Sequence, residues 1–96
     1  MQIERILVLE DEEAFREILL GILRRMRYSA EGAESVAEAR ATLAAASFDL
    51  VLSDVHLPDG TGLELLREQH AREERCLFIM MSGQATLESA IESVRF

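Results

Sequence analysis

The sequence FDLVLSDVHLPDGTG, residues 48–62, joins an apolar run to one carboxylate and then to a group of turn residues. Residues 48–53 lack a sustained polar alternation, which is typical of a strand buried on both faces of a parallel sheet. Asp54 follows this run, and residues 57–60, LPDG, are typical of a turn. The pattern therefore predicts a carboxylate at the carboxyl end of a buried strand.

Three further strands are predicted elsewhere in the chain. Residues 6–9, ILVL, and residues 77–81, LFIMM, are continuous apolar runs, and each stops at polar residues. Residues 28–33, YSAEGA, contain a glycine and lack β-branched side chains, so we expect a short edge strand there.

Helical patterns separate these strands. The first is an apolar stripe at 3.6-residue spacing, which we expect to face the sheet. The stripe consists of Phe15, Ile18, Leu19, Ile22, Leu23 and Met26. Ser35 is predicted to cap a second helix over residues 36–46, with Glu38 completing a capping box. Two more amphipathic patterns cover residues 63–70 and 87–94.

Strands and helices thus alternate as β-α-β-α-β-α-β-α. This order predicts an α/β fold, a doubly wound parallel sheet with right-handed crossovers and helices on both faces. Ligands bind such sheets beyond the carboxyl ends of the strands.

Composition narrows the functional class. A chain of 96 residues is expected to form one domain, and its formal net charge of −8 opposes direct contact with nucleic acid. No apolar run approaches the roughly 18–20 residues that a membrane span needs. Cys76 is the single cysteine and lies in no CxxC motif, so the sequence does not indicate a disulfide framework or a redox motif. We expect a soluble protein of the cytoplasm.

Polar side chains stand at the predicted carboxyl ends of three strands. Glu10 and Asp11 follow residues 6–9, Asp54 follows residues 48–53, and Ser82 follows residues 77–81. Three adjacent carboxylates repel one another unless a cation joins them. Oxygen ligands without His or Cys favour a hard ion, Mg²⁺ or Mn²⁺, over zinc.

Each of these residues also has a simpler interpretation. Glu10 and Asp11 are suitable acids for the start of a helix, Asp54 is an acid before a turn, and Ser82 is a suitable helix cap. These interpretations explain each residue but not their common position at one edge of the sheet. The shared position favours a single site.

Three motifs together resemble a known family. ILVLEDE, FDLVLSDVHLPDGTGLELL and FIMMSG resemble the acidic pair, the phosphoacceptor strand and the switch strand of the receiver domain of bacterial two-component response regulators. The resemblance implies the CheY-like, flavodoxin-like fold with strand order 2-1-3-4. The final segment, SGQATLESAIESVRF, is similar to receivers attached to enhancer-binding transcription activators, which implies a role in transcriptional regulation.

The resemblance also implies roles for individual residues. Asp54 would be the phosphoacceptor, Asp11 a direct Mg²⁺ ligand, and Glu10 a second acid that reaches the metal through water. The backbone carbonyl of His56 would complete the coordination, and Ser82 would contact the phosphoryl group and act as the switch. The domain would be a signalling module rather than an enzyme, with a sensor histidine kinase or a phosphotransfer protein as its partner.

The chain departs from the family at its end. Receivers have five βα units, whereas residues 1–96 supply four, so we expect a receiver domain that is incomplete at its C-terminus. The family's fifth strand carries a lysine, and all ten basic residues here are arginine. Two expectations follow: a homodimer through the exposed edge of strand 77–81, or a longer regulator whose output domain lies beyond Phe96. The alternative function is a phosphorylation-independent interaction or oligomerisation module.

Overall fold

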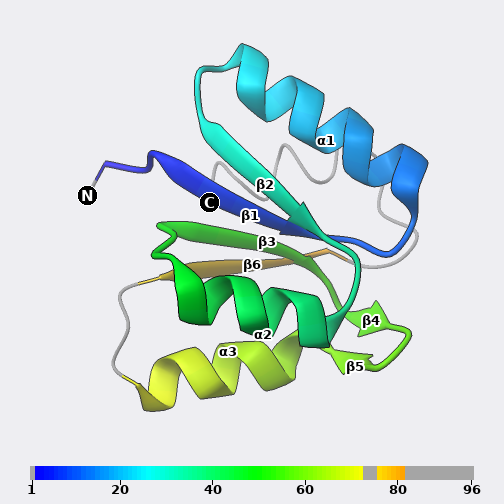
Figure 1. Ribbon diagram of the computed structural model, residues 1–96, viewed down its shortest axis with the longest axis vertical. Helices are drawn as coiled ribbons and strands as arrows, with labels where there is room; N and C mark the ends of the chain where they lie inside the picture. The colour runs from blue at the N-terminus through cyan, green and yellow to red at the C-terminus, as the bar shows by residue number, and fades with distance from the viewer. Residues whose placement is uncertain (1, 73–75, 82–96) are drawn as a thin grey trace.

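The computed structural model describes residues 2–72 and 76–81, which form a parallel sheet with helices on both faces (Figure 1). The sheet strands are β1 (Arg5–Leu9), β2 (Ser29–Ala33), β3 (Leu50–Asp54) and β6 (Leu77–Met81). The helices are α1 (Glu13–Arg25), α2 (Val36–Ala45) and α3 (Gly62–Ala71). A short antiparallel hairpin, β4 (His56–Leu57) with β5 (Gly60–Thr61), stands between β3 and α3.

The sheet has the strand order β2-β1-β3-β6, and all its pairings are parallel. This order confirms the predicted arrangement, since β6 is the fourth of the long strands along the chain. The weak segment predicted as an edge strand is β2, which lies at one edge. Figure 1 shows α1 on one face of the sheet and α2 with α3 on the other.

The core has two layers, one on each face of the sheet. The layer beneath α1 contains Ile6, Val8, Leu19, Leu20, Leu23, Leu50 and Leu52. The layer beneath α2 and α3 contains Leu7, Leu9, Val36, Ala39, Val51 and Leu65. Successive residues from Ile6 to Leu9 and from Leu50 to Leu52 therefore face opposite layers and are all buried, which explains why these runs lack polar alternation.

The predicted apolar stripe of α1 is partly wrong. Ile18 is 52% exposed and Met26 is 58% exposed, whereas Leu20, which lies off the predicted stripe, is 3% exposed. A Cβ atom at Gly32 would come within 3.0 Å of Arg16 Cδ and 3.1 Å of Leu20 Cδ1. The missing side chain at Gly32 lets this side of α1 approach β2, so the buried face is shifted around the helix.

The amino end of α2 differs from the predicted capping box. The Ser35 hydroxyl accepts a hydrogen bond from the Glu38 N–H at 3.1 Å, as expected for an N-cap. The Glu38 carboxylate, however, accepts from the Glu34 N–H at 3.5 Å. The N–H groups of Val36 and Ala37 donate to the carboxylate of Asp59 in the β4–β5 hairpin. A distant residue thus supplies part of the cap.

Two further predictions concern a fourth helix and a membrane span. The helix predicted over residues 87–94 lies outside the described residues. Within the described part of the chain, no helix has the length and apolar character needed to cross a membrane.

Candidate functional site

The carboxyl ends of β1 and β3 lie side by side. Leu9 pairs with Ser53 in the parallel register, so the residues that follow them, Glu10 and Asp54, emerge next to each other. The Glu10 N–H still donates to the Ala33 carbonyl at 3.0 Å, which holds the end of β1 against β2. The parallel topology therefore places the two acids together at this edge of the sheet.

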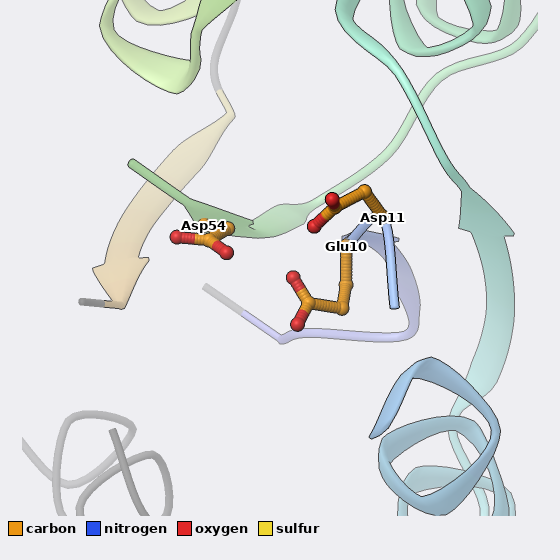
Figure 2. Close-up of side chains that lie close together, drawn as sticks. All are labelled: Glu10, Asp11 and Asp54. Atoms are coloured by element: carbon orange, nitrogen blue, oxygen red, sulfur yellow. The ribbon is translucent and has the colours of Figure 1, made fainter. Parts of the chain in front are cut away.

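Glu10, Asp11 and Asp54 form one acidic cluster. Each offers a carboxylate oxygen, and these oxygens all lie within 4.8 Å of one another. Figure 2 shows the Asp54 side chain facing the other two across the gap between the strand ends. Glu10 and Asp54 are each 6% exposed, while Asp11 is exposed at the mouth of the cluster. The predicted proximity of the three acids is confirmed.

The electrostatics of the cluster are unfavourable without a cation. Burial, a side-chain hydrogen bond with Asp54 and the negative charges of Asp54 and Asp11 together raise the pKa of Glu10 to about 7. Glu10 Oε2 is buried and has no hydrogen-bond partner. A buried, unpartnered carboxylate oxygen is costly in a site without a counter-charge.

These observations fit a hard divalent cation. A cation among the three carboxylates would partner Glu10 Oε2 and offset the mutual repulsion of the acids. The donors are all oxygen atoms, the ligand type that Mg²⁺ and Mn²⁺ prefer. The described acids are therefore able to hold the predicted metal, with Asp11 at the side that faces solvent.

Arg16 supports this site from α1, a role that sequence analysis missed. Its Nη1 donates to the backbone carbonyl of Glu10 at 2.7 Å, and its aliphatic stem lies against Gly32. The guanidinium therefore ties α1 to the chain segment that carries Glu10. Gly32 inside a strand was the available signal, because such a glycine often marks the close approach of another element.

The remaining predicted residues have different outcomes. The His56 N–H donates to Asp54 Oδ1 at 3.3 Å, while the His56 side chain is exposed. Metal coordination by the His56 carbonyl stays a prediction. Ser82 lies outside the described residues, so its contact with the site also stays a prediction. The structure brings together three of the predicted residues and places the His56 main chain beside them.

Close packing at Gly62 keeps the next helix against this edge. The Gly62 N–H donates to the Val55 carbonyl at 3.1 Å. A Cβ atom at Gly62 would lie 2.8 Å from the Asp54 carbonyl oxygen and would also overlap Ser53 Oγ. Only a residue without a side chain allows α3 to begin so close to the end of β3.

A family model described as the response regulator receiver domain matches residues 6–96 of the chain. The chain belongs to this family. This receiver domain is 36% identical over 95 residues to the response regulator protein PilR of Pseudomonas aeruginosa. That match covers 99% of the chain and 21% of PilR, so the chain spans about a fifth of that relative.

Solved structures agree with the assignment. A CheY-like receiver domain protein from Methanospirillum hungatei is 33% identical, with a TM-score of 0.80 over 98% of this chain and 75% of its own. TrrA of Thermotoga maritima, solved in complex with Mg²⁺-BeF, is 28% identical, with a TM-score of 0.78 over 94% of this chain and 80% of its own. The receiver domain therefore has the flavodoxin-like fold of two-component response regulators.

Proposed function

We propose that this receiver domain accepts a phosphoryl group on Asp54 from a phosphohistidine of a sensor histidine kinase or phosphotransfer protein. The observation that carries the proposal is the buried Asp54 carboxylate, which lies within 4.8 Å of two further acids, one of which has an unpartnered oxygen. A purely structural role for these acids would leave Glu10 Oε2 buried without a partner. A phosphoacceptor site that holds a metal ion would provide that partner.

The proposed transfer uses the nucleophilic carboxylate directly. An Asp54 carboxylate oxygen forms a bond to phosphorus, the bond from phosphorus to the donor imidazole nitrogen breaks, and the electron pair stays on that nitrogen. The His56 N–H, bonded to Oδ1 at 3.3 Å, orients the carboxylate. A Mg²⁺ or Mn²⁺ ion held by Glu10, Asp11 and Asp54 would supply positive charge, which would offset the negative charge of the phosphoryl oxygens.

The ligand of a relative supports the choice of metal. The structure of TrrA contains Mg²⁺-BeF. The present chain has a similar fold, and Glu10, Asp11 and Asp54 lie close together in it. We extend this to the present chain as a proposal, with the His56 carbonyl as a further ligand. The chemistry of the donor set and the relative agree on a hard divalent cation.

Phosphorylation would act through partners. The added charge would draw in the Ser82 hydroxyl as a hydrogen-bond donor, and the resulting change would pass to an output domain beyond Phe96. Related regulators include the regulatory protein AtoC of Escherichia coli and the transcriptional regulatory protein ResD of Bacillus subtilis. We therefore propose transcriptional control in the cytoplasm as the setting of this domain.

The test is intact-protein mass measurement after incubation with Mg²⁺ and a small acyl phosphate. We expect one added phosphoryl group on the unaltered protein and on Asp49→Asn, and none on Asp54→Asn. Asp49 is a suitable control because it is a partly buried acid at the opposite end of β3. An adduct that persists in Asp54→Asn would refute the assignment of the phosphoacceptor.

Absence of any adduct at saturating donor would instead favour the alternative, a phosphorylation-independent association module. In the described sheet β6 forms an edge, and its first residue, Leu77, is 49% exposed. Such an edge is suited to pairing with a second copy. Light scattering at micromolar concentration would then be expected to show a dimer.

A further inference from the structure

The β4–β5 hairpin, which begins two residues after Asp54, is attached to a helix that precedes it in the chain. Asp59 at the hairpin turn accepts two hydrogen bonds from the first turn of α2: Val36 N–H to Oδ1 at 2.8 Å, and Ala37 N–H to Oδ2 at 3.0 Å. Both oxygens of one carboxylate are therefore used in a contact that spans 22 to 23 residues of sequence.

The same hairpin is attached to the acidic cluster at its base. The His56 N–H donates to Asp54 Oδ1 at 3.3 Å, and the Gly62 N–H closes the hairpin on the Val55 carbonyl at 3.1 Å. Asp59 thus links the amino end of α2 to the hairpin, and the hairpin, in which His56 pairs with Thr61, is linked by the His56 N–H to the carboxylate of Asp54.

We propose that Asp59 is a positioning residue for the acidic site, because it holds the hairpin and the His56 main chain against the amino end of α2. The inference deepens the proposed function and rests on it, since the His56 main chain is assigned there to the metal and to Asp54. Asp59 itself touches neither the reacting carboxylate nor the metal ligands and acts only through the hairpin.

The local chemistry makes Asp59 difficult to replace. The first N–H groups of a helix have no partner within the helix, and a carboxylate satisfies them well because of the positive end of the helix dipole. The Ser35 hydroxyl already accepts from the Glu38 N–H. Without Asp59, the N–H groups of Val36 and Ala37 would depend on water, and the hairpin would lose its attachment to α2.

The charge state of Asp59 agrees with this role. Hydrogen bonds from the N–H groups of Ala37 and Val36 hold the pKa of Asp59 below its usual range. The carboxylate is therefore ionised at neutral pH, where both of its oxygens accept hydrogen bonds. The contact persists under the conditions in which the acidic site would bind a divalent cation.

Asp49 offers a matched control. Its Oδ2 accepts hydrogen bonds from the N–H groups of Glu4 and Arg5, each at 2.9 Å, so it too binds two backbone donors through one carboxylate. Asp49 is partly buried, and it precedes β3, whereas the acidic cluster lies at the other end of β3. Loss of Asp49 therefore removes a similar local contact without touching the hairpin.

The test compares Asp59→Ala, Asp59→Asn and Asp49→Ala by two measurements. The first is hydrogen exchange of the His56 and Gly62 amides in metal-free protein. The second is Mg²⁺ affinity by calorimetric titration. For Asp59→Ala we expect faster exchange at both amides and Mg²⁺ binding weakened about three- to tenfold, the range that corresponds to loss of a typical capping contribution.

The other variants define the specificity of the effect. Asp59→Asn should lie between Asp59→Ala and the unaltered protein, because an amide oxygen can accept only from one of the two N–H groups while its NH₂ faces the other. Asp49→Ala should keep the hairpin exchange rates and the Mg²⁺ affinity of the unaltered protein, even where its overall stability falls.

The proposal is overturned if Asp59→Ala matches Asp49→Ala in hairpin exchange and in Mg²⁺ affinity. Failure of the proposed function has a different result. If the unaltered protein binds no Mg²⁺, the metal assignment fails, and the metal-free exchange of His56 and Gly62 still decides whether Asp59 positions the hairpin.

Discussion

Replacement of Gly62 by alanine is expected to destabilise the domain, although alanine is the better helix former. Gly62 is the first residue of α3 and is buried against the end of β3. An added Cβ would overlap Ser53 Oγ and would lie 2.8 Å from the Asp54 carbonyl oxygen, where ordinary contacts begin at 3.4 Å. Because the second neighbour is backbone, either α3 or the end of β3 has to move.

The size of the effect follows from two opposing contributions. Overpacking of a well-packed site typically costs about 1–3 kcal/mol, and the helix preference of alanine over glycine returns at most about 1 kcal/mol. The displaced Ser53 hydroxyl would also lose its 2.8 Å hydrogen bond to the Asp54 carbonyl. We expect a net loss of about 1–2 kcal/mol, which lowers the Tm of a domain of this size by about 4–8 °C for each kcal/mol.

Gly21→Ala is the matched control for this experiment. Gly21 lies within α1, and an added Cβ there would have nothing within 4 Å. We expect this variant to gain about 0.5–1 kcal/mol, since only the helix preference changes. Urea unfolding of both variants measures the two shifts. Equal stability of Gly62→Ala and the unaltered protein, or a loss in Gly21→Ala, would refute the argument from close packing.

Three further predictions concern the acids and the core. The pKa of Glu10 is raised from 4.5 to about 7 in the folded protein, so the folded state binds this proton more tightly than the unfolded state does. In the absence of metal, the free energy of unfolding should therefore fall as the pH rises from about 4.5 to about 7. Urea unfolding across this range should show the decline, and Glu10→Gln should abolish it; a decline that persists in Glu10→Gln would assign it to another group. Asp54→Asn should stabilise the metal-free protein at pH 8, because it removes repulsion within the acidic cluster, whereas a loss of stability in the same assay would contradict that repulsion. Leu65→Ala, at a fully buried position of α3, should cost about 2–5 kcal/mol, and the exposed Leu63→Ala much less; similar midpoints in thermal unfolding would contradict the assigned faces of α3.

The acidic site was predictable because its position follows from topology. Apolar runs without polar alternation indicate parallel strands, and the carboxyl ends of parallel strands share one edge. Glu10, Asp11 and Asp54 stand directly after such runs, so their proximity needed no knowledge of side-chain packing. Order along the chain was sufficient in this case.

The supports of the site were not predictable in the same way. The apolar stripe of α1 indicated a helix, but helical spacing alone does not say how the helix is rotated against the sheet. That rotation depends on the space left by Gly32, which admits Leu20 and the stem of Arg16. Similarly, the capping box predicted from Ser35 and Glu38 used only local sequence and left out a partner from the hairpin.

The amino-acid sequence by itself determined the alternation of strands and helices, the two-sided burial of the central strands, and the edge at which the acids meet. These features depend on periodicity and chain order, which are local properties. The tertiary structure alone decided the cap of α2 by Asp59, the closeness of Gly62 to the Asp54 carbonyl, and the burial and neighbouring acids that together raise the pKa of Glu10 to about 7. These features depend on distances of a few ångströms between segments far apart in the chain, and such distances are set by packing.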